Sequence, residues 1–311
     1  MQKDFLRILD FNTEELEEFI LLAIEIKEKF VKKIFHKPLV DRTLGMIFDN
    51  PSTRTRISFE VGMLQLGGHA ISLNSNDIQL SRGETIQDTA RIISRFLDAI
   101  VIRTPSHEVV EILAKHADIP VINGLTERFH PCQILSDIFT IKEKKGYYKG
   151  IHIAYIGDGN NVANSWISAA LRLKFHLTLA CPEGFRPNRE VLETAGKYAE
   201  TEIQVIENPY DAVSDADIIY TDVWVSMGQD SETKKRKEVF SPYQINSNLV
   251  EKAKKDVLIM HCLPAHRGEE ITSQVMDGKN SIIIDQAENR LHLQKAILEI
   301  LLTRNEKNKK E

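Results

Sequence analysis

The sequence has few cysteines, no long apolar run and no excess of basic residues. Its three cysteines are spread over 311 residues and form no Cys-x-x-Cys pair, so we expect neither a disulfide framework nor a zinc site. No apolar stretch approaches the ~20 residues that span a bilayer. The net charge of -5 gives no electrostatic basis for binding nucleic acid or membrane. Residues 1–5 lack the apolar stretch of a secretory signal, and we expect a cytoplasmic protein.

The sequence also lacks the glycine-rich loop of a Walker-type nucleotide site. In its place, an apolar run at Leu44–Ile47 is followed by Phe48-Asp-Asn-Pro-Ser-Thr-Arg-Thr-Arg56 and then by a helical pattern at Ile57–Leu64. A helix N-terminus presents free N–H groups and partial positive charge to an anion. Hydroxyl and guanidinium groups at the same point favour phosphate. The segment therefore predicts an oxyanion site between a strand and a helix.

Short apolar segments alternate with helical patterns along the chain, which predicts parallel sheets covered by helices on both faces. The chain is expected to open with a helix that Asn12 or Thr13 caps. The strands expected in the first half are Leu44–Ile47, His69–Leu73, Ala99–Ile102 and Val121–Ile122. The pattern restarts after a helix at Pro131–Lys145, with strands expected at Ile151–Ile156, His176–Ala180, Glu202–Ile206, Asp217–Thr221, Val257–Met260 and Ser281–Ile284. A last helix is expected from Gln286 to about Leu302. We therefore expect an α/β fold with two doubly wound parallel-sheet domains linked by helices.

Four further polar motifs lie just after predicted strands or in the loops beyond them. They are His130-Pro-Cys-Gln133, Asp222-Val-Trp-Val-Ser-Met-Gly228, His261-Cys-Leu-Pro264 and Glu288-Asn-Arg290. Ligands of parallel α/β sheets bind at the carboxyl ends of the strands, so these positions predict a site independently of any family.

The five motifs, in this order, resemble the aspartate/ornithine carbamoyltransferase family over essentially the whole chain. The last three resemble its ornithine-using members. The resemblance implies a carbamoyl-phosphate domain at residues 1–142 plus 288–311 and an ornithine domain at residues 143–287. It implies carbamoyl transfer from carbamoyl phosphate to the δ-amine of L-ornithine, giving citrulline and phosphate in arginine biosynthesis, with no metal and no cofactor. It further implies a trimer, or a multiple of trimers, with active sites shared between subunits.

By the same resemblance, individual residues receive roles. The residues implied to bind carbamoyl phosphate are Ser52, Thr53, Arg54, Thr55, Gln79, Arg103, His130, Gln133, Cys262, Leu263 and Arg290. Those implied to bind ornithine are Asn161, Asp222, Ser226 and Met227. Arg103, His130 and Cys262 are the implied catalytic residues; Cys262 would accept the proton of the amine or orient it.

Several alternatives remain open from the sequence. Gly157-Asp-Gly159 after a predicted strand mimics a dinucleotide fingerprint, but Val162 stands where the third glycine belongs. A non-catalytic binding protein of the same fold is a second alternative. Among carbamoyltransferases, putrescine or an N-acylated ornithine could replace ornithine as acceptor. Aspartate is disfavoured, because the loop at Asn74–Gly83 offers Gln79 where aspartate-using relatives carry a lysine. The sequence does not decide between the biosynthetic and the catabolic direction.

Overall fold

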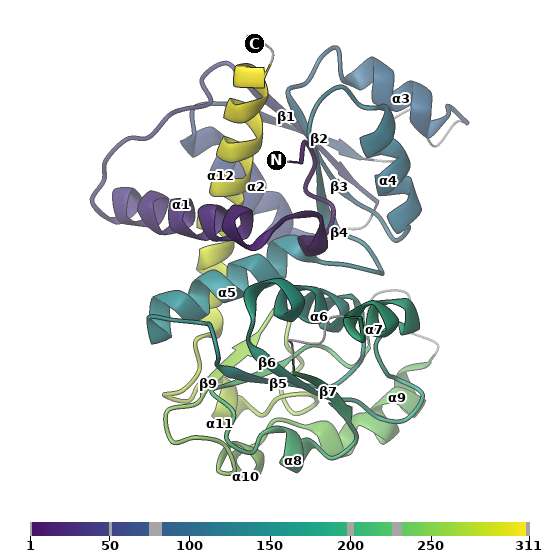
Figure 1. Ribbon diagram of the computed structural model, residues 1–311, viewed down its shortest axis with the longest axis vertical. Helices are drawn as coiled ribbons and strands as arrows, with labels where there is room; N and C mark the ends of the chain where they lie inside the picture. The colour runs from purple at the N-terminus through teal and green to yellow at the C-terminus, as the bar shows by residue number, and fades with distance from the viewer. Residues whose placement is uncertain (1, 50–51, 75–82, 198–201, 226–231, 309–311) are drawn as a thin grey trace. The chain divides into compact units, whose positions relative to one another are not determined.

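A computed structural model describes residues 2–49, 52–74, 83–197, 202–225 and 232–308 of the chain (Figure 1). The chain divides into two compact units: unit 1 is Met1–Glu143 with Glu288–Glu311, and unit 2 is Lys144–Ala287. The chain passes from one unit to the other within two helices, α5 (Pro131–Lys145) and α12 (Ile283–Asn308). The expectation of two parallel-sheet α/β domains linked by helices is confirmed.

Unit 1 is built on a parallel four-stranded sheet with the order β2-β1-β3-β4. Its strands are β1 (Thr43–Phe48), β2 (His69–Asn74), β3 (Ala99–Arg103) and β4 (Val121–Leu125). The central strands β1 and β3 are apolar and buried, as expected for strands covered on both faces, whereas β2 is an exposed edge. The chain turns to opposite sides of β1 to form β2 and β3, so β1 and β3 border the point where ligands bind in such sheets.

The remaining helices of unit 1 are α1 (Thr13–Val31), α2 (Thr53–Gln65), α3 (Ile86–Ile93) and α4 (His107–His116). Figure 1 shows α3 and α4 side by side next to the sheet. Helix α1 begins with a reciprocal cap, because Asn12 Oδ1 accepts from the Glu15 N–H at 2.8 Å and Glu15 Oε2 accepts from the Asn12 N–H at 3.0 Å. The predicted start of this helix is confirmed.

Unit 2 is built on a parallel five-stranded sheet with the order β7-β6-β5-β8-β9. Its strands are β5 (His152–Ile156), β6 (His176–Ala180), β7 (Ile203–Ile206), β8 (Ile218–Thr221) and β9 (Leu258–His261). Its helices are α6 (Asn161–Leu173), α7 (Arg189–Ala195), α8 (Pro209–Ala212), α9 (Thr233–Phe240), α10 (Ser247–Val250) and α11 (Ser273–Met276). Figure 1 shows α6 on one face of this sheet and α8 on the other. Here β5 and β8 border the ligand-binding point.

One predicted strand is wrong. Residues 281–284 form no strand, because α12 already begins at Ile283; Ser281 makes an isolated bridge with Ile259. The N–H of Gln286 bonds the carbonyl of Ile282 at 2.8 Å, as in a helix. Within this apolar run Ile283 is buried while Ile284 is 75% exposed. So short an apolar run does not distinguish a buried strand from the start of a helix.

Candidate active site

The segment between β1 and α2 begins the site in unit 1. Helix α2 starts at Thr53, four residues earlier than the sequence pattern indicated, with Ser52 as its N-cap. The side chain of Ser52 makes no capping hydrogen bond, so its hydroxyl is not committed to the helix. Thr53 is exposed and Arg54 is half-buried. The first N–H groups of any helix have no partner within it, and here they lie beside two hydroxyls and a guanidinium, which suits an anion.

A buried hydrogen-bond network joins three of the predicted motifs within unit 1. Arg290 on α12 donates from Nη2 to Thr55 Oγ1 at 2.9 Å and from Nη1 to Gln133 Oε1 at 3.0 Å. Arg103, at the end of β3, donates from Nη1 to the same Thr55 oxygen at 3.5 Å. Gln133 in turn donates from Nε2 to Asp137 Oδ1 at 2.9 Å. The structure therefore brings four of the predicted site residues together, Thr55, Arg103, Gln133 and Arg290.

His130 lies next to these arginines at the start of α5. It is buried, and burial lowers its pKa well below the ordinary value, with Arg290, Arg103 and Arg54 adding to the effect. The imidazole is therefore neutral near pH 7 and can donate one hydrogen bond without carrying a charge.

Two motif residues of unit 1 are structural. Burial raises the pKa of the Cys132 thiol to about 12, and the thiol donates to the Asn123 carbonyl at 3.4 Å. Asn289 is also buried; its amide donates to Thr140 Oγ1 at 3.0 Å and to Glu143 Oε2 at 2.9 Å, and its oxygen accepts from Lys27 Nζ at 2.7 Å. Asn289 thus fixes α12 against α1 and α5, which orients the neighbouring Arg290.

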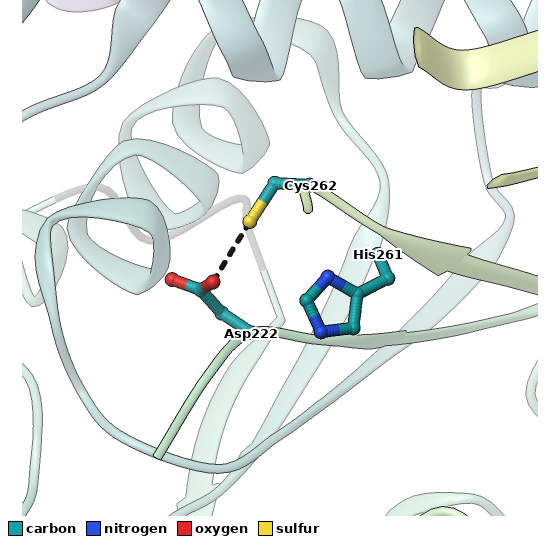
Figure 2. A group of neighbouring side chains, drawn as sticks. All are labelled: Asp222, His261 and Cys262. Atoms are coloured by element: carbon teal, nitrogen blue, oxygen red, sulfur yellow. Dashed lines mark hydrogen bonds between the residues drawn. The ribbon is translucent and has the colours of Figure 1, made fainter. Parts of the chain in front are cut away.

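The centre of the site in unit 2 is Asp222, directly after β8. Its Oδ1 accepts from the Cys262 thiol at 2.9 Å and from the Val223 N–H at 2.8 Å. Its Oδ2 accepts from Asn160 Nδ2 at 2.7 Å. Asp222 is buried and Cys262 is partly buried. The structure therefore brings together a carboxylate and a thiol from two neighbouring strands, and Figure 2 shows the thiol pointing at the carboxylate.

Asn160 is a residue that the sequence did not single out. Its Oδ1 caps α6, accepting from the N–H groups of Val162 at 2.9 Å and Ala163 at 3.3 Å, while its amide holds Asp222. Asn161, which the sequence did single out, is the first residue of α6 and is partly exposed. The pair Asn160-Asn161 could have indicated this role from the sequence, because an asparagine that caps a helix just after one strand can also reach the end of the neighbouring strand.

Gly159, one glycine of the dinucleotide-like segment, has a packing explanation. A Cβ at Gly159 would lie 2.2 Å from the Pro187 nitrogen and 2.7 Å from the Phe185 carbonyl oxygen. The Gly159 N–H also donates to that carbonyl at 2.8 Å. The chain's own backbone therefore occupies the approach that a pyrophosphate uses in a true fingerprint.

The loop that follows β9 is fixed by a buried imidazole–carboxylate pair. His261 Nε2 lies 3.0 Å from Glu270 Oε1, and both side chains are fully buried. His261 Nδ1 accepts from the Leu263 N–H at 2.8 Å, so the proton sits on Nε2. Leu263 has a left-handed φ of 60° and precedes a cis proline. The pair thus holds the backbone on both sides of Cys262.

Asp222, His261 and Cys262 lie close enough to suggest a metal site (Figure 2). A metal would need the His261 Nδ1 lone pair, which already accepts the Leu263 N–H, and the Asp222 oxygens, which accept three hydrogen bonds. The donor set is therefore satisfied internally by hydrogen bonds, and its arrangement favours proton chemistry at the thiol over metal binding.

The structure describes only some of the remaining predicted site residues. Gln79, Ser226 and Met227 lie outside the described residues. Leu263 and Cys262, expected to bind carbamoyl phosphate, belong to unit 2, whereas the other described members of that set belong to unit 1. No described helix is long and apolar enough to cross a membrane.

Comparison with known proteins agrees with the motifs. Residues 3–143 match the aspartate/ornithine carbamoyltransferase carbamoyl-P binding domain, and residues 149–301 match the Asp/Orn binding domain of the same family. The chain is 58% identical over 302 residues to an ornithine carbamoyltransferase of Syntrophus aciditrophicus, covering 97% of this chain and 100% of that one. It is 50% identical over 310 residues to the ornithine carbamoyltransferase of Bacillus subtilis, covering 99% and 96%.

Solved structures show the same similarity. The ornithine carbamoyltransferase of Pyrococcus furiosus is similar to this chain with a TM-score of 0.92 at 51% identity, over 95% of each chain. The anabolic ornithine carbamoyltransferase of Campylobacter jejuni is similar with a TM-score of 0.91 at 40% identity, over 97% of this chain and 100% of that one.

Proposed function

Since the chain belongs to the aspartate/ornithine carbamoyltransferase family, we propose that it transfers the carbamoyl group of carbamoyl phosphate to the δ-amine of L-ornithine. The products are citrulline and phosphate. The observation that carries this proposal is the Asp222–Cys262 pair, held by Asn160 at the ligand-binding edge of unit 2. An arginine-rich anion site in unit 1 supplies the second requirement of the reaction.

Carbamoyl phosphate is assigned to the start of α2. The hydroxyls of Ser52 and Thr53, the N–H groups of the first turn and the Arg54 guanidinium are the groups for its phosphate. No carboxylate among the described residues forms an ion pair with Arg54, whereas Arg56 pairs with Glu60 at 3.6 Å. Arg54 is therefore available for a ligand, and Arg56 already has an intramolecular partner.

Thr55, Arg103 and His130 are assigned to the carbamoyl oxygen. When an amine attacks the carbamoyl carbon, the C–N bond forms and negative charge grows on this oxygen until the C–O bond to phosphate breaks. Donors fixed in advance are the largest expected contribution to the rate. A neutral His130 donates a hydrogen bond without adding a further positive charge to that of the arginines near it. Gln133 and Arg290 hold this arrangement and complete the carbamoyl pocket.

The amine is assigned to Asp222 and Cys262. An alkyl ammonium with a Lys-like pKa near 10.4 must lose a proton before it can attack. The carboxylate attracts the ammonium group, and the thiol hydrogen-bonded to it can orient the amine or, as thiolate, take the proton. Asn161 is assigned to ornithine, as are Ser226 and Met227 on the basis of the family motif.

A citrulline assay tests the proposal. Purified protein is given carbamoyl phosphate with ornithine, putrescine, N-acetylornithine or aspartate, and the carbamoylated product is quantified. Putrescine lacks the carboxylate of ornithine and would leave polar groups of the site unpaired, so we expect kcat/KM for ornithine at least roughly 100-fold higher. Equal or better use of putrescine would overturn ornithine as acceptor and leave carbamoyl transfer intact.

We also propose a homo-oligomer built from trimers, acting in the cytoplasm. Exposed apolar side chains on α2 and β2 support association; Ile57, Leu64 and Ile71 are 55%, 64% and 46% exposed. They lie on or beside a hollow of about 390 Å³ whose lining includes Val61 and Ala70. All three cysteines are free thiols, which fits a reducing compartment. Sedimentation velocity of the parent and of Leu64→Glu tests the oligomer; a monomeric parent would contradict it.

A further inference from the structure

Arg236 is a buried arginine that the proposed chemistry does not use. It lies on α9 and is only 3% exposed. Its Nε donates to the Trp224 carbonyl at 2.6 Å, and its Nη2 bonds the carboxylate of Asp158. Its guanidinium carbon is 4.8 Å from the Phe185 ring centroid and 5.3 Å from that of Phe240. Its Nη1 also lies 3.7 Å from Oε2 of the exposed Glu232 on its own helical segment. Both hydrogen-bond partners and both rings belong to unit 2, so a single side chain fixes several loops of one unit.

The two hydrogen-bond partners of Arg236 lie close in sequence to Asn160 and Asp222, and Asp222 accepts the hydrogen bond of the Cys262 thiol. Trp224 is two positions after Asp222, and Asp158 is two positions before Asn160. Asn160 and Asp222 are in turn joined by a hydrogen bond of 2.7 Å. Arg236 therefore ties the loop after β5 to the loop after β8 at a second point, close to the first.

We propose that Arg236 is a positioning residue for the amine acceptor: its fork sets the separation of the Asn160 and Asp222 loops and thereby the orientation of the Asp222 carboxylate toward Cys262. The inference rests on the proposed function, since it concerns the ornithine half of that site. A misplacement of about 1 Å at a reacting group can lower a rate about 100-fold. Arg236 acts through Asp222 and touches no reacting atom.

A planar fork is needed for this role. One edge of the guanidinium reaches a carbonyl and a carboxylate at once, while its central carbon lies over the rings of Phe185 and Phe240, which contact each other edge to face. A lysine offers a single ammonium point and cannot keep both bonds in that plane. Burial raises the pKa of Asp158 to about 6 and the Arg236 charge opposes the rise, so the pair also keeps this carboxylate ionised near neutral pH.

The test compares Arg236→Lys with two control variants. Arg189→Lys makes the same substitution at an exposed arginine of unit 2 that also pairs with a carboxylate, Glu193, at 2.7 Å. Leu249→Ala removes a buried side chain from the core of unit 2 without changing a hydrogen bond of Arg236. Each variant is assayed for KM of ornithine, kcat, Kd of carbamoyl phosphate by calorimetry, and thermal unfolding, at a temperature where all are folded.

We expect Arg236→Lys to lower kcat/KM for ornithine at least about tenfold while the Kd of carbamoyl phosphate stays within about twofold. Arg189→Lys and Leu249→Ala should change neither by more than about twofold, even where Leu249→Ala lowers the unfolding temperature. If Arg236→Lys alters only stability, as Leu249→Ala does, or weakens carbamoyl phosphate as much as ornithine, the inference is wrong.

A second readout does not depend on activity. Cys132 and Cys181 are buried, so iodoacetamide should label Cys262 first. Arg236→Lys should weaken the hydrogen bond from the Cys262 thiol to Asp222 and raise the labelling rate at least about threefold. Leu249→Ala should leave the labelling rate unchanged. An unchanged rate would overturn the inference. A parent protein that makes no citrulline would instead overturn the proposed function, and the labelling result would still stand.

Discussion

Arg290 Nη2 donates a hydrogen bond of 2.9 Å to Thr55 Oγ1 across 235 positions of the sequence. The other terminal nitrogen of the same guanidinium donates to Gln133 at 3.0 Å. A residue near the C-terminus therefore fixes the relative positions of α2 and α5, the two helices that carry Thr53, Arg54, Thr55 and Gln133. The bonds are buried, so no water competes for them.

This relationship predicts the effect of Arg290→Lys. A lysine reaches one of the two oxygens but not both in the geometry of the fork. We expect carbamoyl transfer to fall by about 100-fold, because Thr55, a proposed donor to the developing oxyanion, loses its fixed position. Steady-state citrulline formation measures the effect, and circular dichroism checks the fold. A folded variant within about threefold of the parent rate would contradict the assignment.

Arg54 and Arg56 form a matched pair for the phosphate assignment. Arg54 has no ion-pair partner among the described residues and Arg56 pairs with Glu60, so only Arg54 is assigned to phosphate. Arg54→Ala should weaken carbamoyl phosphate by about tenfold or more, because a lost charge-assisted bond costs at least ~1.5 kcal/mol. Arg56→Ala should leave the Kd within about twofold. Calorimetry measures the Kd of carbamoyl phosphate for both variants. Equal losses of affinity would contradict the assignment of phosphate to Arg54 alone.

His107 predicts an acid-sensitive contribution to stability. It is buried, donates to or accepts from Thr126 Oγ1 at 3.2 Å, and burial lowers its pKa to about 4, with Arg7 and Arg128 adding to the effect. Its folded pKa lies below the unfolded value of about 6.5, so the unfolded state binds the proton first. The contribution of neutral His107 to the unfolding free energy is therefore present above pH 6.5 and is lost as the pH falls toward 4.

His107→Gln should remove this dependence and keep a polar partner for Thr126. Between pH 7 and pH 5 the variant should lose about 2 kcal/mol less unfolding free energy than the parent. Urea unfolding at the two pH values measures the difference. Buried His130 and His292, whose pKa values are also lowered, remain in the variant, so part of the acid sensitivity should persist. Identical pH dependence in the two proteins would rule out His107 as a source.

Much of this architecture could be predicted from sequence because the apolar periodicity of parallel strands is strong. Strand β6 was predicted with its observed bounds, His176–Ala180, and α5 with its observed bounds, Pro131–Lys145. The strand predicted at residues 281–284 was wrong because so short an apolar run fits either a strand or a helix start; in the fold Ser281 makes only an isolated bridge with Ile259 before α12 begins at Ile283. A sequence pattern thus identifies a helix or strand when the length of the apolar run and its periodicity indicate the same kind of element.

The candidate site was only partly predictable. Thr55, Gln133 and Arg290 belong to recognisable motifs, but the bonds that join them cross up to 235 positions and follow from the tertiary fold. Asn160 and Arg236 were missed because each acts through another residue. In the strongly basic helix Thr233–Phe240, the sequence does not distinguish the buried Arg236 from its exposed lysine neighbours. Arg236 differs because its guanidinium lies over the rings of Phe185 and Phe240, and this contact follows from the tertiary fold.

Cys262→Ser tests the thiol. The serine hydroxyl keeps a donor toward Asp222 but does not ionise in the accessible pH range, so it cannot accept the amine proton as a thiolate could. We expect turnover to fall more than carbamoyl-phosphate affinity, and the pH–rate profile to change shape. Stopped-time citrulline assays from pH 6 to pH 10 measure both. An unaltered turnover with an unaltered profile would leave Cys262 a packing residue.

Asn160→Asp gives the sharpest test of the Asp222 environment. Aspartate is as good an N-cap as asparagine, so the variant should still accept from the Val162 and Ala163 N–H groups. It replaces the N–H donor that lies 2.7 Å from Asp222 Oδ2 with a second carboxylate oxygen. Two carboxylates at that distance cannot both ionise without strong repulsion, so the pair should retain a proton at a pH where isolated carboxyls have lost theirs.

The direction of the resulting pH dependence follows from that shared proton. At low pH the proton bridges the pair and replaces the lost amide donor, so activity should lie closest to the parent. As the pH rises through the raised pKa of the pair, the carboxylates repel, Asp222 leaves its position beside Cys262, and turnover should fall by about 10-fold or more relative to the parent. Asn160→Ala, which adds no charge, should lower turnover by a factor that does not vary with pH across this range. Parallel profiles for Asn160→Asp and Asn160→Ala would show that the amide of Asn160 does not control the charge of Asp222.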